Sequence, residues 1–498
     1  MTIRIILSDL TYTQQTISSD VMPAAVGNIA AYLQVELDGG DGDIEIKIFK
    51  YPEDLADYLA DLKAKGLPIH IAGFSHYVWN RNLSLSFADI VKRHFDRSVI
   101  VFGGPNIPTD AAEQEAFLRS YPVIDYHIVK EGEKPFAKFV AGLTASGFDK
   151  SKLPADLPNL AYIDDLGEFI ASPTVERTLD LEELPSPYVG GWLDEFFDGK
   201  LLPIIQTNRG CPFKCTFCTE GMGYWNKVYK NNQEKVDLEI SYIAEKMAAL
   251  GKSKRSDLHI ADSNFGMYKE DIETAKTLRR VQERYGYPSY INVATGKNKK
   301  ERVLEVATIV NGAMKLAGSV QSLDETVLEN IKRSNIGADQ IMDLGKSADA
   351  VGANSYSEII LGLPGDTRAA HFATLKTLVD AGFNTLCMYQ FMILPGTESG
   401  SAACQQEFDM TTRWRFLPRC YGYYDVLGEE INSAEIEEIC VANKTLSFAD
   451  YLDCRKMNFI INVFYNDGVF RELLKFLDGE GLSIWDWLVE IYQGIGGH

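Results

Sequence analysis

Three cysteines stand close together in the chain, at Cys211, Cys215 and Cys218, with the spacing C-x3-C-x2-C. They follow a short apolar run at 203–207 that predicts a strand. Thiolates are soft ligands that suit iron–sulfur clusters. A cluster of four irons with three cysteine ligands leaves one iron without a protein ligand, and that iron can chelate a small molecule through an amine and a carboxylate. The triplet therefore predicts an iron–sulfur cluster with an open iron.

A structural zinc site, or a group of buried thiols, is the alternative for the triplet. Structural zinc sites normally have four ligands. No histidine or other cysteine lies within about thirty residues on either side, so a closed zinc site would need a distant fourth ligand. The spacing favours the cluster over zinc.

The triplet, with Phe217 before its third cysteine, resembles the signature of the radical S-adenosylmethionine (SAM) superfamily. Later segments are similar to those of superfamily members that have a cobalamin-binding domain, and they fall in the expected order at the ends of predicted strands. These segments are 260–266, 321–324 with 331–333, 358–365 and 394–398. The resemblance implies a [4Fe–4S] cluster, SAM and cobalamin as cofactors.

The chemistry of this superfamily implies an enzyme. The reduced cluster passes one electron to bound SAM, and a 5′-deoxyadenosyl radical then removes hydrogen from the substrate. With cobalamin, one SAM methylates the cobalt, and the substrate radical takes the methyl group from methylcobalamin. We therefore expect methyl transfer to an unactivated carbon of a small or medium substrate. A radical rearrangement or cyclisation, and a non-catalytic corrinoid or iron–sulfur binding protein, stay as alternatives; no catalytic side chain is predicted.

The resemblance also implies side chains that contact SAM. Phe217 would shelter the adenine. Superfamily members usually contact the SAM amino group through a Gly-Gly-Glu-like motif after the second barrel strand, but that place contains Asp262 and Asn264 here. Ser322 after the fourth strand and the Gly362 backbone after the fifth are further candidates. A hydroxyl bonded to its own strand end is an equal alternative for Ser322.

Short apolar runs alternate with helical patterns over about the first 140 residues. This alternation predicts βαβ units and a parallel sheet covered by helices on both faces. Ligands bind such sheets beyond the carboxyl ends of the strands, where glycines and polar residues follow these runs. The predicted strands are 3–7, 44–49, 69–74, 99–102 and 126–129.

This N-terminal region resembles the cobalamin-binding fold attached to many radical SAM enzymes. A flat corrin needs a wide crevice and a close approach to the backbone, which glycines at strand ends allow. Trp79 could pack beneath the ring, and plain core packing is an even alternative for it. The predicted cobalamin contacts are Ser75, Trp79, Gly103, Gly104, Glu131 and Gly132.

The loop after the first strand contains no histidine. Corrinoid domains that supply histidine to cobalt have D-x-H-x-x-G at this place, whereas the chain reads Asp9-Leu-Thr-Tyr-Thr-Gln14. We therefore expect no cobalt ligand from this loop. His76 follows the third strand, and we interpret it as a solvent-exposed or hydrogen-bonded surface histidine in preference to a cobalt ligand.

A second alternating series contains six predicted strands, each followed by a helical stretch. These strands are 203–207, 257–261, 290–294, 314–320, 357–361 and 385–392, as in a partial (βα)6 TIM-type barrel. We therefore expect an α/β protein with four parts. They are a Rossmann-like cobalamin-binding domain (1–145), a connector with a small hairpin (146–198), a radical SAM partial barrel (199–400) and a helical C-terminal cap (401–498).

A basic and aromatic stretch follows the barrel. In it Arg413, Arg415 and Arg419 stand near Trp414 and Phe416. The stretch could face an anionic substrate, but packed or solvated side chains are the better interpretation, because arginine stems pack readily.

The net charge of the 498-residue chain is −21, which does not favour a nucleic-acid partner. The N-terminal residues lack the pattern of a signal peptide. No apolar run approaches the roughly 18 residues of a membrane-spanning helix. We therefore expect a cytoplasmic protein without a membrane partner. A small-molecule or peptide substrate and a one-electron reductant such as flavodoxin or ferredoxin are the expected partners.

Overall fold

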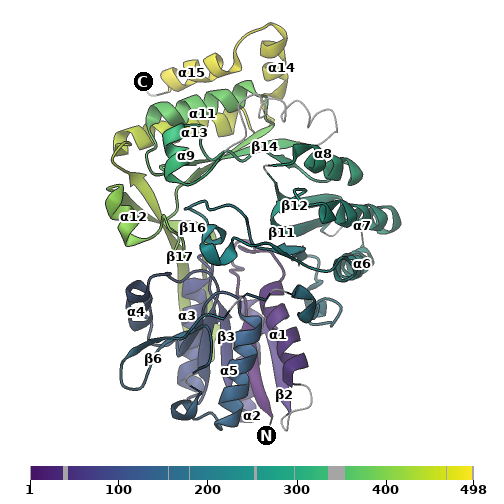
Figure 1. Cartoon of the computed structure of the whole chain (residues 1–498), viewed down its shortest axis with the longest axis vertical. Coiled ribbons are helices and arrows are strands. Elements are labelled where there is room, and N and C mark those ends of the chain that lie inside the picture. The colour runs from purple at the N-terminus through teal and green to yellow at the C-terminus, as the bar shows by residue number, and fades with distance from the viewer. Residues whose placement is uncertain are drawn as a thin grey trace.

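The structure is a computed structural model. It describes residues 2–37, 43–154, 156–175, 177–178, 180–251, 255–296, 298–334, 354–466 and 468–495. Figure 1 shows the N-terminal sheet with its helices at one end, the barrel strands in the middle, and the C-terminal helices at the other end. Both α/β units predicted from the sequence are present.

The first unit is a seven-stranded sheet in the order β2-β1-β3-β4-β5-β6-β7, in which β1 to β5 are parallel. Successive side chains of a strand point to opposite faces. Ile5 therefore joins the core shared with α1 and α5, whereas Ile6 joins the core shared with α2 and α3. The strands are β1 (Ile3–Ser8), β2 (Ile44–Phe49), β3 (Ile71–Ser75), β4 (Val99–Gly103) and β5 (Tyr126–Ile128), and the helices are α1 (Ala24–Leu37), α2 (Pro52–Lys65), α3 (Arg81–His94), α4 (Ala111–Ser120) and α5 (Glu133–Ala145).

The hairpin expected in the connector forms between β6 (Leu160–Ile163) and β7 (Phe169–Ala171). β6 pairs antiparallel with β5, so the hairpin extends the N-terminal sheet. The sheet therefore continues beyond residue 145, where the first domain was expected to end.

The second unit is an open barrel of two parallel three-stranded sheets, β12-β11-β8 and β13-β14-β15. A bridge between Ile291 and Met314 joins the two sheets. All six predicted strands are present. They are β8 (Ile204–Ile205), β11 (Asp257–Phe265), β12 (Tyr290–Thr295), β13 (Leu316–Ala317), β14 (Ser355–Leu361) and β15 (Thr385–Gln390), with helices α6 (Gln233–Ala249), α7 (Glu270–Tyr285), α8 (Lys300–Ile309), α9 (Glu325–Asn330), α11 (Arg368–Asp380) and α12 (Ala402–Glu407).

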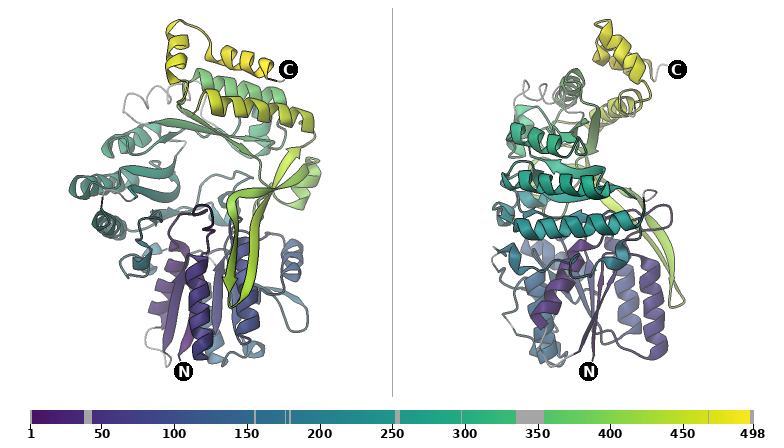
Figure 2. Two further views of the ribbon diagram at one scale, coloured as in Figure 1. Left: turned by 180° about the vertical axis from the view of Figure 1, so that it is seen from behind. Right: turned by 90° about the vertical axis from the view of Figure 1, so that its right-hand side faces the viewer.

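The C-terminal region contains the expected helices α13 (Phe448–Phe464), α14 (Arg471–Gly479) and α15 (Ile484–Gly494). They are preceded by a long antiparallel ribbon of β16 (Thr411–Val426) and β17 (Glu429–Ala442), which the sequence interpretation missed. Figure 2 shows the ribbon, in light green, extending from the barrel end back along the N-terminal unit. The buried Glu435 carboxylate fixes it there, because it accepts hydrogen bonds from the backbone N–H groups of Asn82 and Leu83 at the start of α3.

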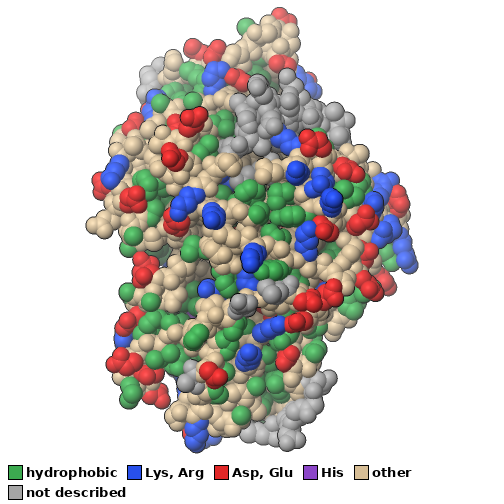
Figure 3. Space-filling model, viewed as in Figure 1, with side chains coloured by type: hydrophobic (Ala, Val, Ile, Leu, Met, Phe, Trp, Pro, Cys, Tyr) green, Lys and Arg blue, Asp and Glu red, His purple; other side chains and the backbone are tan. Residues whose placement is uncertain are grey.

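The basic and aromatic stretch lies on β16, where the Trp414 and Phe416 side chains are 57% and 73% exposed. On the face drawn in Figure 3, acidic and basic side chains are mixed. Within the described ranges, no helix is both long and apolar enough to cross a membrane.

Candidate functional site

Two cavities lie on either side of the segment that contains the three cysteines. The larger, of about 880 Å³, lies between the carboxyl ends of the N-terminal strands and the barrel, and Gly104, Glu131 and Trp225 are among its lining residues. The smaller, of about 160 Å³, lies inside the barrel and is lined by all three cysteines. We call residues 210–228 the cysteine loop. Glu220 of this loop lines both cavities.

The cysteine loop places its thiols through tight backbone contacts. The N–H of Cys218 donates to the carbonyl of Cys215 at 3.2 Å, and the N–H of Gly221 donates to the carbonyl of Cys218 at 3.0 Å. A Cβ on Gly221 would lie 2.1 Å from the Cys215 carbonyl oxygen, so only glycine fits there. The Nδ2 of Asn264, at the end of β11, donates to the Sγ of Cys211 at 3.2 Å.

The three thiols fit an iron–sulfur cluster by their chemistry. Burial, with a smaller contribution from the Glu220 charge, raises the pKa of the Cys218 thiol to about 11, and burial likewise raises the pKa of Cys211. Metal binding would therefore have to displace these protons. Across the described parts of the chain, no group of three or more His, Cys, Asp or Glu side chains is arranged to hold one metal ion. A cubane cluster uses a different arrangement, because each cysteine binds a separate iron.

Two of the predicted SAM contacts, Phe217 and Asn264, line the small cavity. Asp262 does not. It is buried beside the cavity, where its carboxylate accepts hydrogen bonds from the Thr207 N–H at 2.8 Å and from Asn208 Nδ2 at 2.6 Å. Burial raises the pKa of Asp262 to about 7. Asp262 therefore fixes the chain that leads into the cysteine loop.

Ser322 and Gly362 are also absent from the described lining of the small cavity. The Oγ of Ser322 accepts a hydrogen bond from the Asp324 N–H at 3.2 Å. A local hydrogen bond of this kind was the expected alternative to a SAM contact. The N–H of Gly362 donates to Asp366 Oδ2 at 2.9 Å and closes a turn. The geometry therefore gives both residues a role in their own loops.

Five of the six predicted cobalamin contacts line the large cavity, namely Ser75, Gly103, Gly104, Glu131 and Gly132. Gly104 has a φ of +137°, and a Cβ there would lie 2.6 Å from the His76 carbonyl oxygen, so the position requires glycine. The sixth, Trp79, does not line the cavity in the described set. Its ring stacks on Tyr77 at 4.4 Å, and Tyr77 lines the cavity in its place.

His76 is fully buried, so the expectation of a surface histidine is wrong. Its Nδ1 lies 3.1 Å from His127 Nε2, and its Nε2 lies 3.2 Å from Asn106 Nδ2. Burial lowers the pKa of both histidines, to about 3 for His127. His76 is therefore neutral, and its two ring nitrogens are already engaged.

Asp9, the first residue after β1, forms a second buried polar group. The carboxylate of Asp9 pairs with Lys50 Nζ at 2.9 Å and accepts a hydrogen bond from Ser75 Oγ at 2.5 Å. Ser75 thus lines the cavity, but its hydroxyl hydrogen points to Asp9. This network fixes the carboxyl ends of three neighbouring strands.

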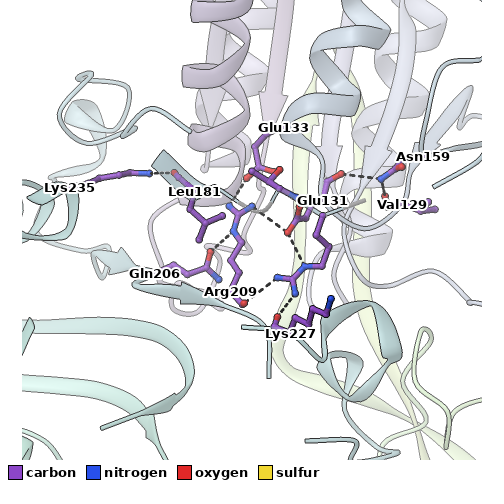
Figure 4. A network of polar contacts seen from close by, with 11 residues as sticks. Val129, Glu131, Glu133, Asn159, Leu181, Gln206, Arg209, Lys227 and Lys235 are labelled. Atoms are coloured by element: carbon purple, nitrogen blue, oxygen red, sulfur yellow. Dashed lines mark hydrogen bonds and ion pairs between the residues drawn. The ribbon is translucent and has the colours of Figure 1, made fainter. Parts of the chain in front are cut away.

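A buried network of charges joins the two units, as Figure 4 shows. Arg209, two residues before Cys211, pairs with Glu133 at 2.5 Å and donates from Nε to Gln206 Oε1 at 2.8 Å. Glu131 lies 3.4 Å from Arg177 Nε and accepts a hydrogen bond from the Thr178 N–H at 2.8 Å. The Glu131 carboxylate, predicted as a cobalamin contact, therefore also holds the connector.

Arg177 closes the base of the cysteine loop, and the sequence interpretation missed it. Its guanidinium donates to the carbonyl oxygens of Arg209, at 3.1 Å, and of Lys227. The same group lies over the rings of Trp225 and Tyr229, at 4.9 and 4.7 Å from their centroids. One buried side chain thus ties together the two ends of the loop.

Residues 205–398 match the family model of the radical SAM superfamily. This segment begins on β8, contains the cysteine loop and ends shortly after β15, so it coincides with the open barrel. Residues 205–398 are therefore a radical SAM domain, as the cysteine triplet predicted.

The chain resembles two curated methyltransferases. The 2-(S-pantetheinyl)-carbapenam-3-carboxylate methyltransferase of Streptantibioticus cattleyicolor is 27% identical over 82% of this chain and 58% of the relative. The cobalamin-dependent radical SAM methyltransferase TokK of Streptomyces tokunonensis is 29% identical over 69% of this chain and 50% of the relative. The chain thus matches about half to three-fifths of the length of these relatives.

The fold also resembles a solved structure, that of the radical SAM methyltransferase TsrM from Kitasatospora setae, which has cobalamin and a [4Fe–4S] cluster bound. The TM-score is 0.61, with 15% identity, over 84% of this chain and 77% of that chain. The predicted fold class, a parallel sheet followed by a partial barrel and C-terminal helices, is therefore confirmed.

Proposed function

We propose that the chain is a cobalamin-dependent radical SAM enzyme that transfers a methyl group to an unactivated carbon. The observation that supports this most is the cysteine loop between two cavities, with the three thiols facing the small cavity and the other side facing the large one. The names of the two curated relatives support methyl transfer as the reaction. When bound, the cluster would supply an electron for SAM cleavage, and cobalamin would supply the methyl group.

In this proposal Cys211, Cys215 and Cys218 hold the cluster and leave one iron for SAM. Asn264 donates to the Cys211 sulfur, which orients it and stabilises its negative charge. Phe217 covers the adenine from within the small cavity. The tight turn at Gly221 keeps the loop in one conformation.

The large cavity would hold the corrin ring. Its volume of about 880 Å³ lies near the top of the range usual for cofactor sites, about 300–1,000 Å³. Gly103 and Gly104 allow close approach to the backbone, and Tyr77 presents a ring in front of Trp79. His76 is neutral, and both of its ring nitrogens have hydrogen-bond partners. We therefore propose that the loop after β3 gives cobalt no histidine ligand.

The substrate is proposed by class alone. One curated relative is named for a carbapenam carboxylate, so we propose a small or medium molecule as the methyl acceptor. The electron would come from a one-electron reductant such as flavodoxin or ferredoxin. The cytoplasmic location predicted from the sequence stays a prediction.

The proposal is tested by anaerobic reconstitution with iron, sulfide and cobalamin, followed by incubation with SAM and a strong chemical reductant. Formation of both 5′-deoxyadenosine and S-adenosylhomocysteine would support methyl transfer. Formation of 5′-deoxyadenosine alone would indicate a rearrangement or cyclisation. If neither product formed with fully loaded protein, the chain would be a binding protein and the proposal would be wrong.

A further inference from the structure

Glu220 occupies a position that the resemblance did not predict. It lies two residues after Cys218, on the short 3-10 helix Thr219–Gly221, and its side chain is partly buried. Glu220 is shared by the lining of the small cavity and that of the large one. A carboxylate therefore stands beside the thiols, where the two cavities come closest.

The end of β11 holds this carboxylate in place. The Oγ of Ser263, within the segment 262–264 that replaces the Gly-Gly-Glu-like motif, donates a hydrogen bond to Glu220 Oε2. The flanking residues of that segment have other partners, since Asp262 is bonded to the chain before the cysteine loop and Asn264 to Cys211. The end of β11 thus contributes no acidic side chain to the small cavity. Glu220, from the cysteine loop, contributes a carboxylate there instead.

The charges around the small cavity are mixed. Its described lining contains two carboxylates, Glu220 and Glu358, and two cations, Lys300 and Arg333. Glu358 comes from β14, on the other half of the barrel, and accepts a hydrogen bond from Ser319 Oγ at 2.7 Å. Of the two carboxylates, Glu220 is the one on the cysteine loop and beside the large cavity.

We propose that Glu220 is a SAM-binding residue that recognises the cationic sulfonium of SAM together with the N–H groups of its amine. This inference rests on the proposed function, because it requires SAM as the ligand of the small cavity. A fixed carboxylate stabilises a cation in a partly buried site far better than in water, because screening is weaker there. Glu220 thus supplies the carboxylate that the end of β11 lacks.

The test compares SAM with S-adenosylhomocysteine, which lacks the methyl group and the sulfonium charge but retains the amine. Both affinities are measured by anaerobic equilibrium dialysis with reconstituted wild-type protein, Glu220→Gln and Glu220→Asp. Glu220→Gln should weaken SAM binding about tenfold or more and S-adenosylhomocysteine binding clearly less. Glu220→Asp, which keeps the charge, should retain most of the preference for SAM.

Glu283→Gln is the matched control, because Glu283 lies on the outer helix α7, is 61% exposed and pairs only with the neighbouring Arg279 in the described contacts. It should leave both affinities unchanged. The inference would be wrong if Glu220→Gln kept the wild-type ratio of affinities, or if Glu358→Gln lost the preference for SAM while Glu220→Gln kept it. Loss of iron from Glu220→Gln would also overturn it, since the carboxylate would then serve the loop and not the ligand. If the wild-type protein bound no SAM, the proposed function itself would fail, which is a distinct result.

Discussion

Arg209 and Glu133 form a buried ion pair across the two units of the chain, with 2.5 Å between Nη2 and Oε1. Arg209 leads into the cysteine loop, and Glu133 begins α5 at the edge of the large cavity. Removing one partner of such a pair typically costs roughly 3–5 kcal/mol, because a charge stays buried alone. The cysteine loop and the loop after β5 are therefore fixed relative to each other by electrostatics as well as by packing.

Glu133→Gln should reduce the acid sensitivity of the fold. Burial alone would raise the pKa of Glu133, but the charge and hydrogen bonds of Arg209 outweigh it, so the pKa lies below the ordinary value of 4.5. The ionised carboxylate therefore stabilises the folded state above about pH 4.5, and this contribution is lost as the pH falls further. The variant should be less stable at pH 7 by roughly 3–5 kcal/mol.

Urea unfolding of the wild type and of Glu133→Gln at several values from about pH 7 to 3 measures this effect. The free energy of unfolding should fall less steeply for the variant than for the wild type as the solution becomes acidic. Glu115→Gln, which removes an exposed ion pair with Arg119, is the control and should follow the wild type. Parallel curves for Glu133→Gln and the wild type would show that the pair has no such role.

Arg177→Met should loosen the cysteine loop while keeping most of the packing of the arginine stem. The methionine cannot donate to the carbonyls of Arg209 and Lys227, which then stay buried without this donor. We expect less iron after reconstitution, and SAM cleavage per bound iron reduced about tenfold or more, because small displacements of reacting groups are costly.

Arg177→Lys serves as the conservative variant. The lysine keeps the positive charge, but it lacks the forked guanidinium and can donate to only one of the two carbonyls, of Arg209 or Lys227, at a time. It should recover part of the iron content. Arg119→Met, at an exposed arginine on α4, should leave both quantities as in the wild type. Normal iron content and cleavage in Arg177→Met would refute the role given to this side chain.

Gly104→Ala should impair the large cavity more than an ordinary glycine substitution. The new Cβ would lie 2.6 Å from the His76 carbonyl oxygen, in addition to the strain of a φ of +137°. Gly167→Ala is matched in having a positive φ, of +81°, but has no atom within 4 Å of the added Cβ. We expect the strain at Gly167 to cost about 1 kcal/mol and the change at Gly104 roughly 2–3 kcal/mol or more.

The stability of the two variants is measured by thermal unfolding, and their affinity for cobalamin is measured by absorbance. Gly104→Ala should lose affinity for cobalamin, whereas Gly167→Ala should bind it as the wild type does. Equal behaviour of the two variants would argue against the large cavity as the cobalamin site.

Local patterns in the sequence predicted much of the fold. The apolar runs of β1 to β5 are bounded by amphipathic helices, so their alternation is visible within short windows. The cysteine triplet is likewise a local signal. The ribbon was missed because its residues gave no clear period: Trp414 and Phe416 are exposed, whereas Glu435, a residue type usually found on the surface, is buried against α3.

The parts of the site that depend on distant contacts could not be predicted from the sequence. Arg177 lies in the connector, outside every motif, and its role arises from carbonyl groups that only the folded loop brings together. Tyr77 and Trp79 are both aromatic, and only the fold decides which of them lines the cavity. Glu220 could have been noticed as the acidic residue nearest to the triplet, but its hydrogen-bond partner Ser263 lies 43 residues further along the chain, on β11.

The most direct test of the central claim is electron paramagnetic resonance of the reduced, reconstituted protein before and after SAM is added. We predict the signal of a [4Fe–4S] cluster with about four irons per chain, a change of that signal when SAM binds the open iron, and loss of both in Cys215→Ala but not in Cys404→Ala, at a cysteine on α12. Zinc in place of iron, or a cluster signal that SAM leaves unchanged, would contradict the account.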